Sequence, residues 1–224
     1  LTELLKELCK LDFRWVRLHY LYPELIDDEL IDEIASEDKI VKYLDIPIQH
    51  INDTILRRMN RRGTGEEIRA LFQKLRERIP GLVLRTSLIT GLPGEGEAEF
   101  EELCHFLREA KIERAGVFPY SPEEGTPAAL MPDRCSTEEA QRRAELCMEI
   151  QAEIMDGFAE TFIGRELDVL VMDREPDGTP WGRSEYDSPD IDSRVIFSGD
   201  AAPGDMVRVR ITGTDDGELI GEQI

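Results

Sequence analysis

Hydrophobic residues follow two different periodicities along the chain, and the change falls near Thr161. Before that point, segments such as 65–78 and 97–110 carry apolar residues at helical spacing, which indicates amphipathic helices. Short apolar runs between them predict strands. The expected strands are 14–22, 43–48, 82–89 and 114–120. This alternation predicts a parallel sheet with right-handed crossovers, and four strands suit part of a β/α barrel, with a doubly wound sheet as the alternative.

The second part of the chain has the pattern of an all-β domain. A Pro/Gly-rich loop at 121–133 and a long helix at about 136–160 lead into it. Beyond Phe162, short segments alternate apolar and polar residues, and turn sequences such as Pro176-Asp-Gly178 separate them. These segments are 166–172, 181–184, 194–197, 206–212 and 219–222. Five short strands with polar turns predict a small β-barrel, so we expect two domains, 1–160 and 161–224.

The composition is that of an acidic, folded protein. Hydrophobic residues make up 41% of the 224 residues, which is enough for a core, and the formal net charge is -21. Such acidity disfavours a general nucleic-acid binder, because phosphate contacts need clustered Lys and Arg. It fits a basic partner, or a surface that serves only solubility. No apolar run reaches membrane-spanning length, so we expect no membrane partner.

The four cysteines lie far apart in the sequence, and we expect free thiols in a reducing cytoplasm. They are Cys9, Cys104, Cys135 and Cys147. Zinc and iron–sulfur sites usually draw their ligands from short spacings, which this chain does not offer, so we expect no metal site. The chain begins at Leu1 within a segment that already has a helical pattern, and we interpret it as a fragment of a longer protein.

Polar residues at the expected strand ends are the candidates for a binding site, because β/α barrels place their active sites there. Gln49 and His50 follow the second strand. Arg85 interrupts an apolar strand, where a guanidinium needs an anion. Either a bound ligand or a structural ion pair within the protein would supply that anion. The glycines of Gly91-Leu-Pro-Gly94 would let a ligand approach the backbone closely, or would form only a turn.

Together, the motifs resemble those of the radical-SAM methylthiotransferases, and the resemblance covers essentially the whole chain. The matching segments are WVRLHYLYP at 15–23, LDIPIQH at 44–50, MNRR at 59–62, RTSLITGLPGE at 85–95 and VFPYSPEEGT at 117–126. The tail is similar to a TRAM domain, the small barrel at the end of these enzymes. The resemblance implies a six-stranded radical-SAM barrel, of which the expected strands would be the third to the sixth.

The resemblance also implies cofactors. In this family, three cysteines of a CxxxCxxC loop hold a [4Fe–4S] cluster that cleaves S-adenosylmethionine, and a preceding domain holds a second cluster. None of those cysteines is present in this chain. The cluster ligands and the first two barrel strands would therefore lie upstream, and we expect the chain alone to be inactive.

Six positions of this chain are implied to lie beside the cofactor. They are Gln49, Arg85, Ile89, Gly91, Phe118 and Tyr120. Ile89 and Gly91 fall in a pattern close to the GxIxGxxE of radical-SAM barrels, which packs against adenine. The sequence departs from that pattern at Ser87, where a glycine is expected, and at Glu95, which comes one residue late.

The other four positions are assigned by their place at the strand ends. Gln49 suits a hydrogen bond to the polar part of the cofactor or substrate. Arg85 suits a carboxylate through a bidentate pair. Phe118 and Tyr120 suit the adenine or the substrate entrance.

The family divides into enzymes that modify a tRNA adenosine and enzymes that modify an aspartate of a small-subunit ribosomal protein. Two features resemble the second, RimO-type branch: 121–126 lacks the Arg typical of the tRNA class, and Gln49-His50 replaces Gln-Ser-Gly. From Glu160 onward the chain has 16 acidic and 6 basic residues, a balance of -10. That charge would repel tRNA and attract a basic ribosomal protein. The alternatives are a tRNA-modifying enzyme of the family and a non-catalytic protein-binding module.

Overall fold

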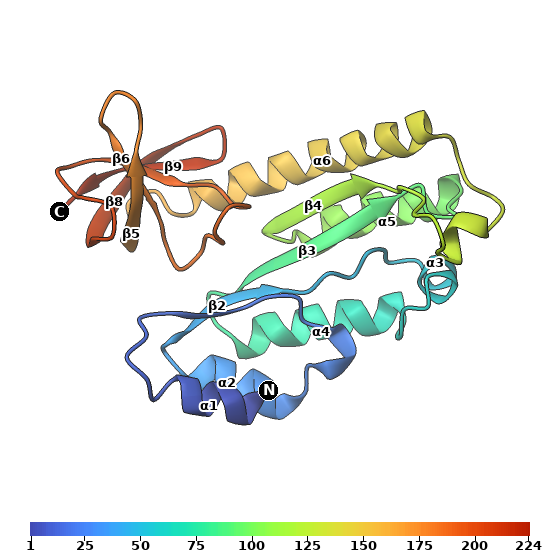
Figure 1. The fold of residues 1–224 in the computed structure, drawn as a ribbon, viewed down its shortest axis with the longest axis horizontal. Coiled ribbons are helices and arrows are strands. Elements are labelled where there is room, and N and C mark those ends of the chain that lie inside the picture. The colour runs from blue at the N-terminus through green and yellow to red at the C-terminus, as the bar shows by residue number, and fades with distance from the viewer. The chain divides into compact units, whose positions relative to one another are not determined.

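The computed structural model describes residues 1–224 and divides them into two compact units, Leu1–Gln151 and Ala152–Ile224. The first unit contains a four-stranded parallel sheet of order β1-β2-β3-β4 (Figure 1). The strands are β1 (Val16–Leu18), β2 (Ile40–Asp45), β3 (Val83–Thr90) and β4 (Arg114–Pro119). The expectation of parallel strands in an α/β unit is confirmed.

Two of the expected strands have different bounds in the structure. The first was expected to continue to residue 22, but the chain turns away at Tyr20, whose φ is 57°. The second begins earlier than expected, at Ile40, and ends at Asp45. Pro47 has no N–H to donate, and beyond Asp45 the pairing with β3 continues only through the bond from Ile46 N–H to Arg85 O and an isolated bridge from Gln49 to Leu88. The segment between β2 and the next helix is therefore an irregular loop at the edge of the sheet.

Six α-helices and two short 3-10 helices connect the strands. They are α1 (Thr2–Leu8), η1 (Pro23–Leu25), α2 (Asp28–Ser36), α3 (Asp53–Arg58), α4 (Gly65–Arg78), α5 (Glu97–Ala110), η2 (Ala128–Leu130) and α6 (Thr137–Glu160). α4 begins with a capping box: the Thr64 hydroxyl accepts the N–H of Glu67, and the Glu67 carboxylate accepts the N–H of Thr64. None of the helices has the length and apolarity needed to span a bilayer.

The two faces of the sheet differ in character. Side chains alternate along β3, so Leu84 and Leu88 point into the core, which also contains Phe72 of α4 and Phe106 of α5. Arg85 and its alternate neighbours Ser87 and Ile89 therefore lie on the opposite face. Arg85 and Ser87 thus place polar groups on this face, and Ile89 follows them at the carboxyl edge.

The second unit contains a closed β-barrel of order β5-β6-β7-β9-β8. Its strands are β5 (Glu166–Arg174), β6 (Pro180–Arg183), β7 (Val195–Ser198), β8 (Met206–Asp215) and β9 (Glu218–Gln223). All five correspond to predicted segments, and the prediction of a small β-barrel is confirmed. Val169, Phe197, Val209 and Ile211 are among the buried residues that fill its interior. β5 and β8 run further than expected because each continues its ladder into the adjoining hairpin.

Candidate functional site

A cleft of about 540 Å³ opens at the carboxyl ends of β2, β3 and β4. Its lining comes from four segments of the first unit. The lining residues are Gln49, Met59, Arg61, Ile89, Leu92, Phe118, Pro119, Tyr120 and Ser121. Four of the six predicted site residues, Gln49, Ile89, Phe118 and Tyr120, are therefore brought together here. The volume is within the usual range for small-molecule sites.

Gln49 is held by its backbone and leaves its side chain available. Its N–H donates to Ser87 O at 2.9 Å, and its carbonyl accepts the N–H of Ile89 at 2.8 Å. The residue has a φ of 70°, which is uncommon for a non-glycine residue, and such strain is maintained only where surrounding contacts fix the backbone. The side-chain amide makes no hydrogen bond within the chain. It can therefore donate to and accept from a ligand.

Phe118 and Tyr120 form the wall of the cleft at the end of β4. Phe118 is 54% exposed, although its side chain is large and apolar. The Tyr120 hydroxyl is buried and has no hydrogen-bond partner. An unsatisfied buried hydroxyl costs about 1–3 kcal/mol, so such a group usually has a partner when the site is filled. Both features point to a ligand that covers the aromatic wall.

Gly91 lies beside a neighbouring cleft rather than the first one. This second cleft has a volume of about 620 Å³ and is mainly polar, and Tyr120 lines both. Gly91 has a φ of +76°, and a Cβ at this position would lie 2.4 Å from the Cβ of Ala140 in α6. Only glycine fits this turn, so the residue shapes the loop that ends β3.

A buried cluster of His50, Glu95 and Arg143 fixes that loop. Glu95 Oε1 accepts the N–H of Gly91 and a bond from Arg143 Nη1, both at 2.9 Å. Its Oε2 lies 3.4 Å from His50 Nε2, while His50 Nδ1 accepts the N–H of Asn52 at 3.0 Å. Burial raises the pKa of Glu95, but the nearby His50 and the hydrogen bonds from Gly91 and Arg143 outweigh burial and leave the pKa below its usual value.

Local sequence patterns did not predict this cluster. Arg143 lies in α6, far along the chain, and nothing in its surroundings distinguishes it from a surface helical arginine. Glu95 comes one position late for the adenine-side pattern, yet its carboxylate supports the Gly91 turn. Its role in this structure is to position the backbone of the loop.

Arg85 has a carboxylate partner within the chain. Its Nη1 lies 2.8 Å from Oδ1 of Asp45, and the Asp45 side chain is fully buried. Asp45 Oδ2 also accepts the N–H of Tyr20 at 3.2 Å, which ties the end of β1 to β2. The structure therefore places Arg85 in an ion pair outside the lining of the 540 Å³ cleft.

The residues of this chain fit one of the two implied cofactors. No group of three or more His, Cys, Asp or Glu side chains is arranged to hold a metal ion. Cys104 and Cys147 are close, with 3.9 Å between their sulfur atoms, but both are buried between α5 and α6. The chain's own residues therefore do not fit a [4Fe–4S] cluster. The cleft fits an adenine-containing ligand better, because it combines aromatic walls, an available amide and an unsatisfied hydroxyl.

Comparison with known proteins gives the same fold and two matching domains. The profile of the Radical SAM superfamily matches residues 1–107, and that of the TRAM domain matches residues 163–224. Coproporphyrinogen III oxidase (HemN) from Escherichia coli, described as a radical SAM enzyme, has a similar fold: the TM-score is 0.57 and the identity 16%, over 82% of this chain and 48% of that chain. Fold and domains together define a radical SAM protein with a TRAM domain.

Curated relatives narrow the assignment. The ribosomal protein uS12 methylthiotransferase RimO of Geobacter sulfurreducens is 49% identical over 100% of this chain and 51% of the relative. The protein of the same name from Geotalea uraniireducens is 47% identical over 99% of this chain and 50% of the relative. The chain belongs to this family, the RimO-type methylthiotransferases, as the motifs indicated. It spans about half the length of the curated relatives it matches.

Proposed function

We propose that this chain supplies the cofactor cleft and a substrate-docking barrel to an enzyme that adds a methylthio group to an aspartate of ribosomal protein uS12. The cleft at the strand ends carries this proposal, with its unsatisfied Tyr120 hydroxyl, together with the identity to uS12 methylthiotransferases along the whole chain. A ribosomal substrate would place the reaction in the cytoplasm.

In this proposal the cleft residues bind S-adenosylmethionine by complementary chemistry. Ile89 and Phe118 offer apolar surface to the adenine, and Gly91 shapes the adjoining loop. The Gln49 amide and the Tyr120 hydroxyl hydrogen-bond the polar part of the ligand. When bound, S-adenosylmethionine supplies the radical chemistry of the superfamily. The residues of this chain orient it and exclude water, while Arg85 acts through Asp45 to hold the ends of β1 and β2.

The charge of the barrel supports a basic protein partner. The arginines that could have contacted phosphates are already engaged. Arg194 pairs with Glu175 and Glu218, Arg208 with Asp168, Arg210 with Glu166, and Arg174 with Asp200. Arg183 donates to two carbonyls, and Arg165 lies over the ring of Phe162. The excess carboxylates remain, so the surface favours a Lys/Arg-rich ribosomal protein over tRNA.

The test is a chimera in which this chain replaces the matching half of the Geobacter sulfurreducens relative. After reconstitution with iron and sulfide, the chimera is incubated with S-adenosylmethionine, sulfide, a low-potential reductant and uS12, and separately with the same reagents and tRNA. The products are examined by mass spectrometry. We expect methylthio addition to uS12. A folded chimera with the same iron content as the relative but no uS12 product would refute the proposal. Modification of tRNA instead would support the sister activity.

A further inference from the structure

We propose that the end of α3 and the segment after it dock RNA of the small ribosomal subunit, and that arginines contact its phosphates. The segment 57–62 contains four arginines, Arg57, Arg58, Arg61 and Arg62, and no acidic residue. Arg57, Arg58 and Arg62, together with Arg134 of a neighbouring loop, make up what we call the arginine surface. That the RNA is ribosomal rests on the proposed function, because uS12 is a ribosomal protein.

The local charge of this surface is opposite to that of the chain. The chain has 48 acidic residues among 224 and a net charge of -21, yet the stretch 54–65 carries its four arginines without a single acidic residue. Charges separated by more than about 8 Å are largely screened at physiological ionic strength. A local basic surface can therefore attract phosphates although the whole chain is acidic.

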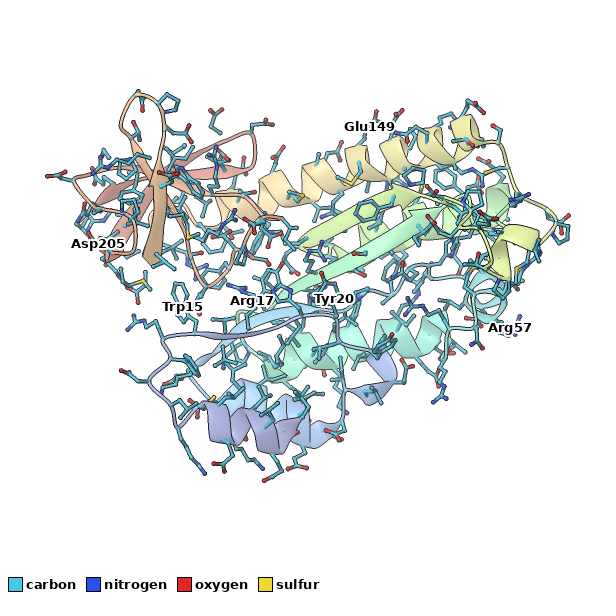
Figure 2. The ribbon with its side chains drawn as sticks, viewed as in Figure 1. Trp15, Arg17, Tyr20, Arg57, Glu149 and Asp205 are labelled. Carbon is cyan, nitrogen blue, oxygen red and sulfur yellow. The ribbon has the colours of Figure 1, made fainter.

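Most donors of the arginine surface are available to a ligand. Arg62 and Arg134 are exposed, and their side chains make no ion pair or hydrogen bond. Arg57, which Figure 2 labels on α3, donates only to the Thr54 hydroxyl of its own helix, at 3.2 Å. This sets the surface apart from the β-barrel, where most arginines are engaged in ion pairs.

Backbone contacts fix the shape of this surface before RNA binds. Asn60 adopts a left-handed conformation with a φ of 54°. The N–H of Asn60 donates to Arg57 O at 3.1 Å, and the N–H of Arg61 donates to Leu56 O at 2.9 Å. This is the bonding pattern of a Schellman motif, which ends α3. The arginines on both sides of this cap thus start from a fixed backbone, which reduces the entropy lost on binding.

The loop that carries Arg134 lies beside α3. Arg58 Nη2 is 3.6 Å from Asp133 Oδ2 and donates to Pro132 O at 3.4 Å. The N–H of Gly94 donates to Asp133 O at 2.8 Å, which ties the loop to the turn after β3. Asp133 is exposed, and exposed ion pairs contribute about 0–1 kcal/mol, so Arg58 can exchange this carboxylate for a phosphate at little cost.

Two features favour RNA over an acidic protein as the partner. All cations of the segment are arginines, whose planar guanidinium binds phosphate through two parallel hydrogen bonds. Tyr20 and Tyr22 are 75% and 53% exposed, and the Tyr22 ring centre lies 5.8 Å from the guanidinium carbon of Arg61. Exposed aromatic rings next to arginines can stack on unpaired bases. Arg61 has no ion pair and lines the 540 Å³ cleft, so RNA bound here would lie beside the cleft that a segment of uS12 must reach.

The first experiment measures binding of this chain to a short fluorescein-labelled oligouridylate by fluorescence anisotropy over a series of salt concentrations. The test variant is Arg57→Gln/Arg62→Gln. The control variant is Arg108→Gln/Lys111→Gln, which removes two exposed cations without ion pairs at the end of α5. Both variants therefore change the net charge equally. Polyglutamate is the competitor that represents an acidic protein.

We expect the control variant to bind as the wild type does and the test variant to bind about tenfold more weakly at low salt, which corresponds to about 1.4 kcal/mol. Each phosphate contact on a single strand contributes about 0.7 to the slope of log K against log salt, so the test variant should reduce this slope by about 1.4. Equal weakening by the two variants would overturn the proposal. So would displacement of the RNA by polyglutamate as readily as by unlabelled RNA, or a wild type that does not bind.

The second experiment places the same variants in the chimera and compares small ribosomal subunits with free uS12 as substrates. The test variant should modify uS12 in the subunits more slowly than the control variant does, and free uS12 at the same rate. Equal rates on both substrates would show that the surface does not dock ribosomal RNA. A chimera that modifies neither substrate would refute the proposed function but not RNA binding, which the titration measures without cluster, cofactor or uS12.

Discussion

The turn at Gly91 provides the sharpest test of how the carboxyl edge of the sheet is built. Substitution of alanine there has two separable effects. The residue must keep a φ of +76°, and the new Cβ would lie 2.4 Å from Ala140 Cβ. The left-handed conformation costs about 1–2 kcal/mol for a residue with a Cβ. The overpacking adds about 1–3 kcal/mol, so Gly91→Ala should destabilise the first unit by about 2–5 kcal/mol.

Gly81→Ala is the matched control. Gly81 has a φ of +75° in the same unit, but a Cβ there would meet nothing within 4 Å. This variant should lose only the conformational part, about 1–2 kcal/mol. Hydrogen exchange measured by mass spectrometry across a urea series gives the stability of peptides from β3 and α5, and so reports on this unit alone. Equal destabilisation by the two variants would refute the role assigned to the contact between Gly91 and α6.

Three further predictions concern buried groups. Because the pKa of Glu95 is lowered from 4.5, its charge stabilises the fold above that pH, and the stabilisation is lost as the pH falls through the lowered value. The difference in urea midpoint between wild type and Glu95→Gln should therefore shrink in acid; a pH-independent difference would contradict this. Asp45→Ala should destabilise the first unit by about 3–5 kcal/mol, since it leaves Arg85 without its carboxylate. A loss below about 1 kcal/mol in urea unfolding would show that the ion pair is dispensable. Phe197→Ala should lower the free energy of unfolding of the barrel by about 3–5 kcal/mol, measured by hydrogen exchange of peptides from 163–224. Met172→Ala, at a 39% exposed position, should change this free energy by less than about 0.5 kcal/mol. Similar losses in the two variants would argue against the assigned barrel core.

The sequence predicted those parts of the fold that depend on local periodicity and turn chemistry. The five barrel strands and the parallel order of the first unit follow from such patterns. Contacts between distant segments could not be predicted in this way. Asp45 pairs with Arg85 of the next strand, and Arg143 reaches Glu95 across 48 positions. The position of Arg85 in an apolar strand indicated a need for an anion, but not which carboxylate would supply it. Arg143 carries no local signal, because a lone charged residue in a helix is compatible with many environments.

The candidate site was likewise predictable from the sequence only in part. The position of Gln49, Ile89, Phe118 and Tyr120 at strand ends sufficed to bring them to one cleft. Arg61 was present in a recognised motif, but its availability depends on which carboxylates lie nearby in three dimensions. That property becomes visible only when the ion pairs of its neighbours, such as Arg58 with Asp133, are known.

The central claim is that the cleft at the ends of β2, β3 and β4 holds the cofactor, and a titration of the chimera with S-adenosylhomocysteine tests it most directly. Isotope-labelled isoleucine methyl groups report the site: Ile89 lies in the cleft, whereas Ile79 is fully buried in the core of the first unit. The account predicts that the Ile89 signal shifts to saturation, that Ile79 does not respond, and that Tyr120→Phe weakens binding. Saturable binding that leaves Ile89 unchanged would contradict it.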